Sequence, residues 1–123
     1  MLQTEFEFTL PKGYLDAHGN LHRRGMMRLA KAIDEIVPLR DPRVKANPAY
    51  STVIVLARVI TCLGALEEIT PTIIEGLFAC DLNYLHRFYL QINELEDESD
   101  NTTAQNLQSG LKSEELQGTI SPG

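Results

Sequence analysis

The chain opens on a stretch in which apolar and polar residues alternate. In "TEFEFTL", Phe6, Phe8 and Leu10 fall on one side of an extended backbone, and the residues between them are glutamate or threonine. This period of two predicts a half-buried strand. A turn cluster, "DAHGN", comes next, and "LHRRGMMRLA" after it predicts a second, less regular strand in which Gly25 would suit a bulge. We therefore expect an N-terminal β-hairpin.

From residue 30 onward the pattern becomes helical, and one local device occurs three times. Each copy places a capping residue directly before a proline: Asp41-Pro42, Asn47-Pro48 and Thr70-Pro71. Asp, Asn and Thr accept a hydrogen bond from an otherwise unpaired N–H in the first helical turn. Proline at the first helical position lacks an N–H that would have stayed unpaired there. The pairs predict three helix starts, preceded by a short helical segment, "KAIDEIV", that stops before Pro38.

The stretch "YSTVIVLARVITCLGAL" is the most apolar part of the chain. Its apolar residues recur at helical spacing, which predicts one core helix from Pro48 to Leu63 that ends at Gly64. Arg58 lies on the remaining polar face and is expected to point outward or towards a carboxylate. A central arginine costs about 2.5–3.5 kcal/mol in a membrane-spanning helix, so we expect no membrane span.

The last predicted helix, "DLNYLHRFYLQINEL", has Asp81 as its cap and continues through Leu95. Its apolar residues cover more than one helical face, which leaves two interpretations open. Either the helix is a core helix with some excess, or the surplus aromatic residues hold a partner, since Tyr and Phe are enriched at interface cores. In the second case a groove would receive an amphipathic helix. The candidate partner-binding residues are Tyr84, Phe88, Tyr89 and Ile92.

Charge divides the chain near the end of this helix. Residues 1–93 carry ten acidic and ten basic side chains, whereas residues 94–123 carry seven acidic ones and one lysine. The net charge of −6 therefore belongs to a C-terminal segment without aromatic residues, which cannot bury enough apolar area to offset chain entropy. We predict an α+β domain over residues 1–95, a β-hairpin followed by a small bundle of three to four helices. A disordered acidic tail is predicted for 96–123.

The neutral charge of the predicted domain argues against nucleic-acid binding, which needs a net basic face. Arg40, Arg43 and Lys45 are explained as solvated loop residues, because no aromatic residue is interleaved with them to stack on bases. Cys62 and Cys80 lie in apolar stretches and are expected to pack as small hydrophobic side chains in a reducing compartment. The N-terminus shows neither the basic nor the apolar region of a signal peptide, so a cytoplasmic location is expected.

No pattern in the sequence indicates an enzyme. It contains no G-x-S-x-G, Walker, dinucleotide or H-E-x-x-H motif. Adjacent carboxylates such as Asp34 and Glu35 would diverge on a helix instead of converging on a substrate. His18 and His22 have an H-x₃-H spacing, but they lie in a turn and neither cysteine has a ligand nearby in sequence. We therefore predict no catalytic residue, no cofactor and no metal site.

The order of these features resembles the tail assembly chaperone family of contractile-tailed phages, Mu-like and P2-like, and its cyanobacterial relatives near phage-tail-like injection systems. The family similarly has an opening hairpin of the form F-x-L-P-x-G-Y-x-D-x-x-G-x-L-H-R. It continues with an apolar helix ending in Arg-x-x-x-x-Leu-Gly, here Arg58 to Gly64, and a Thr-Pro start to the closing helices, here Thr70-Pro71. The resemblance covers residues 4–94, and "AKAIDEIVPLRD" departs from it. The matching stretches are "FTLPKGYLDAHGNLHR", "LRDPRVKANPAY", "VIVLARVITCLG", "ITPTIIEGL" and "LHRFYLQIN".

The resemblance implies a non-enzymatic assembly chaperone that binds the tape measure protein while a phage tail or phage-like contractile injection particle is built. A structural baseplate or tail-end subunit of the same kind of particle is the alternative, and the T-even-like baseplate assembly family, with similarly small α+β proteins, is a related resemblance. A small toxin-neutralising or regulatory protein is a third hypothesis outside this class. Self-association stays open, and neither a nucleic-acid nor a membrane partner is expected.

Overall fold

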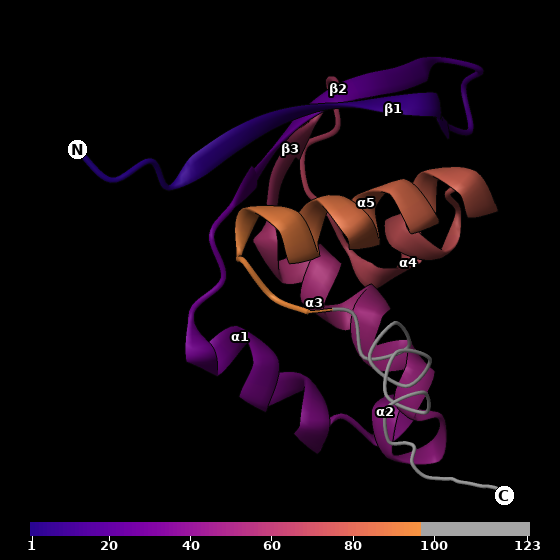
Figure 1. Cartoon of the computed structure of the whole chain (residues 1–123). Helices are drawn as coiled ribbons and strands as arrows, with labels where there is room; N and C mark the ends of the chain where they lie inside the picture. The colour runs from indigo at the N-terminus through magenta and orange to yellow at the C-terminus, as the bar shows by residue number, and fades with distance from the viewer. Residues whose placement is uncertain (97–123) are drawn as a thin grey trace, which may run out of the picture. The chain divides into compact units, whose positions relative to one another are not determined.

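The computed structural model of the chain describes residues 1–96. It begins with an antiparallel hairpin of β1 (Glu5–Leu15) and β2 (Leu21–Arg28), as the alternating pattern predicts (Figure 1). Phe8 and Leu10 are buried, while Glu7 and Thr9 on the opposite side of β1 are exposed. One face of the hairpin therefore supplies core residues and the other faces solvent.

A third strand, β3 (Ile60–Leu63), pairs antiparallel with β2 and corrects the predicted long helix. The chain from Pro48 to Leu63 is divided between η2 (Pro48–Tyr50), α3 (Ser51–Val59) and β3. Ile60 has already left helical geometry, with φ −81° and ψ 115°. Periodicity cannot separate a buried strand from a buried helical turn within a short apolar run, and pairing with β2 decides this one.

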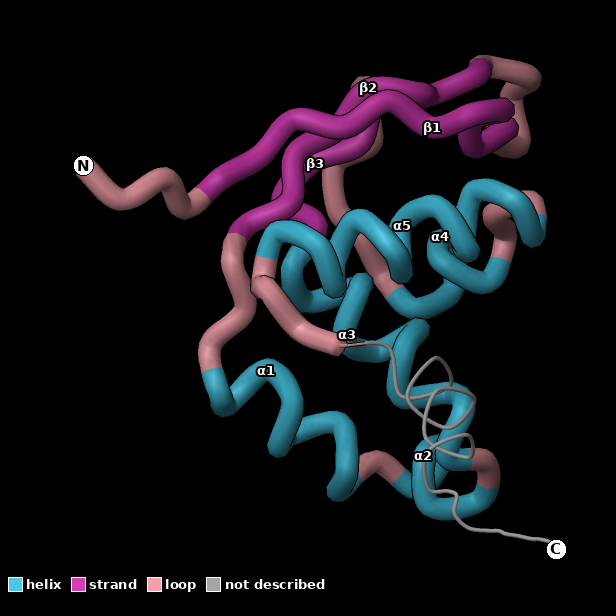
Figure 2. Tube along the Cα trace, in the orientation of Figure 1, coloured by secondary structure: helices cyan, strands magenta, loops and turns pink. Residues whose placement is uncertain are grey.

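The helices form a second layer against the buried face of the sheet. α5 (Ala79–Ile92) runs along β1 beneath the sheet, and α3 contacts both α5 and α4 (Pro71–Glu75) (Figure 1 and Figure 2). Between β2 and α3 the chain forms α1 (Ala32–Ile36), η1 (Val37–Arg40) and α2 (Pro42–Ala46). The protein is thus an α+β fold, whose predicted hairpin is the larger part of a three-stranded sheet.

Strands and helices contribute jointly to one hydrophobic core. Its buried residues come from β1, β2, β3, α3, α4 and α5, and none comes from α1, η1 or α2. The fully buried side chains in this core include Leu10, Met27, Leu56, Val59, Leu63, Ile74 and Leu85. The segment from α1 to α2 buries Pro38 and Val44 outside this cluster, and polar contacts described below also attach it to the rest of the domain.

Gly25 occupies a crowded position in the centre of β2, opposite Phe8. A Cβ atom there would lie 2.5 Å from the Phe8 ring and 2.5 Å from the carbonyl oxygen of Cys62. Glycine is thus required because the Phe8 ring lies directly against the strand. The bulge that the sequence suggested at Gly25 of the hairpin does not lie there, because the β1–β2 register shifts between Thr9 and Tyr14 and the β2–β3 register between Met26 and Met27.

The three cap-and-proline pairs are helix starts, as predicted. Asp41, Asn47 and Thr70 each accept a hydrogen bond from a backbone N–H in the first turn of α2, η2 and α4. The predicted short helix also forms as α1, and it continues directly into η1, which contains Pro38. These elements follow from local chemistry, because cap, proline and helix start are adjacent in sequence.

Replacing Asn47 by alanine is expected to lower the free energy of unfolding by about 1 kcal/mol through loss of this cap. Asn83 lies on the exposed side of α5 and provides the control, so Asn83→Ala is expected to change stability by less than about 0.5 kcal/mol. Urea unfolding followed by circular dichroism measures both values. Equal losses in the two variants would contradict a specific role of the Asn47 side chain.

The two cysteines differ from expectation. Both are exposed free thiols, so neither packs as a small hydrophobic side chain. Cys62 belongs to β3, in which the first and last residues, Ile60 and Leu63, are buried and Cys62 between them is exposed. Cys80 lies in the first turn of α5 beside the buried Asp81. Both cysteines lie in apolar stretches of the sequence, but the adjacent residues, Leu63 and Asp81, take the buried positions.

The chain divides into two units, Met1–Asn93 and Glu94–Gly123. The predicted boundary after residue 95 falls two residues beyond this division, and the predicted disordered acidic tail lies, apart from Glu96, outside the described residues. None of the helices within residues 1–96 is long and apolar enough to cross a membrane.

Candidate functional site

The side chains of α5 are sorted into rows, because residues four apart lie on the same side of a helix. The innermost row is buried and the outermost is exposed, with a half-buried row on each flank. These rows are, from inside to outside, Asp81, Leu85 and Tyr89; Tyr84, Phe88 and Ile92 on one flank; Leu82, His86 and Leu90 on the other; and Asn83, Arg87 and Gln91 outermost.

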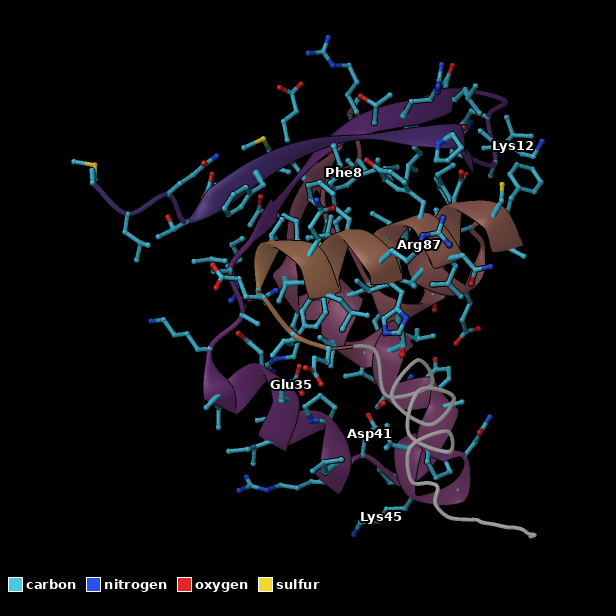
Figure 3. All side chains as sticks on the ribbon, in the orientation of Figure 1. Phe8, Lys12, Glu35, Asp41, Lys45 and Arg87 are labelled. Carbon is cyan, nitrogen blue, oxygen red and sulfur yellow. The ribbon has the colours of Figure 1, made fainter. Side chains whose placement is uncertain are left out.

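Three of the four predicted partner-binding residues share one flank of α5, and we call Tyr84, Phe88 and Ile92 the aromatic edge. The rings of Tyr84 and Phe88 stack with centroids 5.9 Å apart. Phe88 also meets Phe8 of β1 edge-on, with centroids 5.9 Å apart, and Phe8 lies between β1 and α5 (Figure 3). The edge is thus fixed on the core side and half exposed on the other, which suits contact with an apolar surface.

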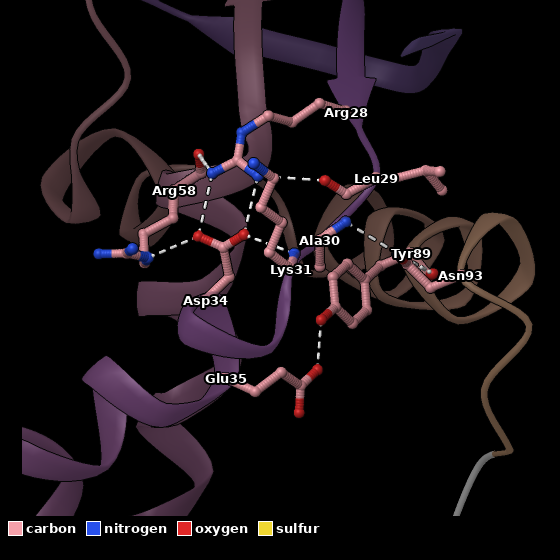
Figure 4. Close-up of polar contacts among 9 residues, drawn as sticks. All are labelled: Arg28, Leu29, Ala30, Lys31, Asp34, Glu35, Arg58, Tyr89 and Asn93. Carbon is pink, nitrogen blue, oxygen red and sulfur yellow. Dashed lines mark hydrogen bonds and ion pairs between the residues drawn. The ribbon is translucent and has the colours of Figure 1, made fainter. Parts of the chain in front are cut away.

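Tyr89, the fourth predicted residue, has a different position. Its side chain is only 4% exposed and lies in the hydrophobic core. Its hydroxyl donates a hydrogen bond to Glu35 of α1 (Figure 4). Burial, together with this hydrogen bond, raises the pKa of Tyr89 well above its usual range. Tyr89 therefore offers no surface to a partner, and the excess of apolar residues on α5 is partly core, as the first interpretation held.

Asp81 anchors α5 to the hairpin, which corrects its predicted role as a helix cap. α5 begins at Ala79, and the Asp81 side chain is fully buried. Its two carboxylate oxygens accept the backbone N–H groups of Lys12 and Gly13, at 2.9 and 2.8 Å. Gly13 has φ +107°, a conformation that glycine adopts readily. The β1–β2 register shifts between Thr9 and Tyr14, so Asp81 binds the irregular part of β1.

The C-terminus of α5 is joined to the start of the α1 segment. Asn93 follows the last helical residue, Ile92, so the helix ends before the predicted Leu95. The Asn93 side chain accepts the N–H of Ala30 at 2.9 Å and donates to the carbonyl oxygen of Tyr89 at 2.9 Å (Figure 4). An amide side chain thus ends the helix by bonding both to the helix itself and to the chain before α1.

Asp34 of α1 is the centre of a buried polar network (Figure 4). Arg28 of β2 donates to both carboxylate oxygens, at 2.8 and 3.0 Å. Arg58 of α3 donates through Nε at 2.9 Å, and the backbone N–H of Lys31 donates at 2.8 Å. The hydrogen bonds from Arg28 are the largest cause that holds the pKa of Asp34 well below its usual range. This network attaches α1 to the sheet and to α3.

The network shows the outcome of two predictions, the orientation of Arg58 and the divergence of Asp34 from Glu35. Arg58 points towards a carboxylate, the second of the two orientations expected from its place in an apolar run. Asp34 and Glu35 do diverge, because Asp34 meets Arg28 and Arg58 while Glu35 meets Tyr89. Sequence reasoning gave no reason to expect Asp34 to be buried, since Arg58 is 24 residues away and Arg28, although six residues away, belongs to the preceding strand.

The turn of the hairpin, between β1 and β2, is held by a second polar cluster. Asp16 accepts the backbone N–H groups of His18 and Asn20, both at 2.9 Å. Ala65 donates its N–H to Nδ1 of the buried His22, so Nε2 carries the proton and donates to Asp16 at 2.8 Å. The hydrogen bond from His22, with those from the backbone, lowers the pKa of Asp16 to about 2. The cluster ties the hairpin turn to the loop after β3.

Both ring nitrogens of His22 are therefore occupied, which removes it as a ligand for a metal. No group of three His, Cys, Asp or Glu side chains able to hold a metal ion occurs in residues 1–96. Arg23, the neighbour of His22, donates through Nε to the carbonyl oxygen of Leu10 at 2.9 Å. Asp16, His22 and Arg23 of "FTLPKGYLDAHGNLHR" are thus engaged in holding the hairpin, and the aromatic edge is the candidate site that remains.

A comparison of the chain with protein-family models, with curated proteins and with solved structures finds no match.

Proposed function

We propose that this protein is a non-enzymatic assembly chaperone of a phage tail or phage-like contractile injection particle, acting in the cytoplasm of the producing cell. The proposed partner is the tape measure protein, a long, helix-rich chain. The sequence resemblance over residues 4–94 supports the class of function. The aromatic edge supports the mode of action, because stacked, half-exposed rings on a rigid helix provide apolar contact area with little loss of side-chain entropy on binding.

The hairpin motif supports a role without catalysis. Its Asp16 and His22 form a pair that in another setting would serve acid–base chemistry. Here Asp16 also accepts two backbone N–H groups, and the second nitrogen of His22 accepts a third. Side chains whose hydrogen-bonding atoms are all used within a turn stabilise that turn, so the resemblance in this stretch is one of fold.

Co-expression of this chain with the product of the longest helix-rich open reading frame near its own gene tests the proposal. We expect the partner to become more soluble and to co-purify with this chain. Tyr84→Glu, which places a charge on the aromatic edge, is expected to reduce co-purification at least tenfold. Asn83→Glu introduces the same charge one residue away on the exposed row and should leave it unchanged.

Absence of both solubilisation and co-purification would contradict the chaperone function. If the partner co-purified equally well with the Tyr84→Glu variant, the chaperone function would stand, but the aromatic edge would be excluded as the surface that binds the partner. Mass spectrometry of purified particles separates the alternative, because a stoichiometric amount of this chain in mature particles indicates a structural baseplate or tail-end subunit.

A further inference from the structure

In the segment formed by α1 and η1, Asp34 and Pro38 are buried, and three large apolar side chains face outward. Asp34 is 1% exposed, whereas Ile33, Ile36 and Leu39 are 46%, 45% and 60% exposed. Residues three apart share a side of an α-helix, and in a 3₁₀-helix they are aligned. Ile33 and Ile36 in α1 and Leu39 in η1 therefore form one row, which we call the α1–η1 stripe.

In α1, where Asp34 is the buried residue, this orientation is the reverse of the usual one. An amphipathic helix of a globular protein normally turns its apolar side to the core. Here the ion pairs of Asp34 with Arg28 and Arg58 hold the helix from its inner side. No stripe residue belongs to the hydrophobic core of the described chain. Contiguous exposed apolar rows of this kind commonly mark interaction sites.

The three carboxylates of residues 31–41 are all engaged by other groups of the chain. Asp34 is bound by its two arginines, and Glu35 accepts from the hydroxyl of Tyr89. Asp41, directly after η1, forms an ion pair with Arg43 at 2.9 Å. The negative charges of this segment are thus already directed towards internal partners.

The cations at the two ends of the stripe are not engaged in this way. Lys31 immediately precedes α1 and Arg40 is the last residue of η1, and both are exposed. Within residues 1–96, neither side chain forms an ion pair with a carboxylate. Among residues 1–96, the stripe is therefore an apolar row with a positive charge at each end that no carboxylate pairs.

The charges of Lys31 and Arg40 indicate whether a second copy of this chain or another protein fits the stripe. If a second copy packed its stripe antiparallel on the first, Lys31 would meet Arg40, and in a parallel arrangement each cation would meet its own counterpart. Both arrangements bring like charges together, which opposes association. A complementary occupant carries carboxylates at both ends of an apolar row of similar length.

We propose that the α1–η1 stripe binds an amphipathic helix of another protein, whose apolar face is bordered by Asp or Glu. The helix lies along Ile33, Ile36 and Leu39, and its carboxylates pair with Lys31 and Arg40. The stripe is a different surface from the aromatic edge, and the inference stands whether or not the proposed partner is the tape measure protein.

Two synthetic helices measured on the full chain test this. Both have the same row of leucines and a length of about 18 residues, enough for five helical turns. One has Glu and the other Lys bordering the leucines, and fluorescence anisotropy measures their affinities. We expect the Glu helix to bind at least tenfold more tightly. Arg40→Glu should weaken its binding and strengthen that of the Lys helix.

Two further variants locate the site. Ile36→Asp places a charge in the middle of the stripe and should reduce binding of the Glu helix at least tenfold. Leu15→Asp is the matched control, because Leu15 is a similarly exposed apolar residue, 52% exposed, at the end of the hairpin. It should leave binding unchanged, and circular dichroism should show that both variants keep the wild-type fold.

Three results would overturn the proposal. One is equal affinity for the two helices, or affinity that Ile36→Asp does not change. Another is a dimer of the free chain in sedimentation experiments that Ile36→Asp abolishes, which would assign the stripe to self-association. The third is binding to phosphatidylserine vesicles that Ile36→Asp abolishes, which would assign it to a membrane surface.

Discussion

Replacing Asp34 by asparagine is expected to lower the free energy of unfolding by about 3–5 kcal/mol, because it removes one partner of a buried charge network. Arg28 and Arg58 would lose their counter-charge, and the new amide group would direct N–H donors at guanidinium donors. A loss of this size is a large share of the about 5–15 kcal/mol that stabilises a typical domain. Urea unfolding measures it.

The same variant changes the dependence of stability on pH. Since the folded-state pKa of Asp34 is depressed, its contribution is fully present above the unfolded-state pKa of about 3.9. The contribution is lost as the pH falls below that value and through the lower folded-state pKa. Wild-type stability should therefore decrease in acid, and this part of the decrease should be missing in Asp34→Asn.

The control for both measurements is Glu7→Gln. Glu7 also binds an arginine, Arg24, but the two side chains are 55% and 75% exposed. Exposed pairs contribute little, so the loss should stay below about 1 kcal/mol. If Asp34→Asn cost no more than Glu7→Gln, the buried network would not be what attaches α1 to the domain.

Replacing Asp81 by asparagine is the second change with a large expected effect, a loss of about 3 kcal/mol. Hydrogen bonds to a charged acceptor contribute about 1.5–3 kcal/mol each, and Asp81 accepts two from Lys12 and Gly13. An asparagine has one acceptor oxygen, so its NH₂ group would face the other backbone N–H. Urea unfolding gives the loss, and amide hydrogen exchange should be faster at Lys12 and Gly13 in particular.

Glu67→Gln provides the comparison, because Glu67 is an exposed carboxylate in the loop after β3. Its effect should lie within about 0.5 kcal/mol of zero. Unchanged hydrogen exchange at Lys12 and Gly13 in Asp81→Asn would show that the irregular part of β1 holds its shape without α5. The hairpin would then be an independent unit, and its geometry would no longer depend on the helix that carries the aromatic edge.

The sequence by itself determined the elements whose causes are local. The alternation around Phe8 defines β1, and the caps Asp41, Asn47 and Thr70 define three helix starts, because each signal lies within a few residues of the structure it produces. The helical pattern from Asp81 to Leu95 likewise predicts α5, which the structure places at Ala79–Ile92.

Only the tertiary structure decided the features that depend on residues far apart in the chain. Ile60–Leu63 is a strand because β2 offers it hydrogen bonds, although the apolar run alone fits a helix. Asp34 and Asp81 are buried because their partners, Arg58 and the amides of Lys12 and Gly13, come from other elements. The burial of Asp34 in turn directs the apolar side of α1 to solvent, so the α1–η1 stripe exists only in the folded protein.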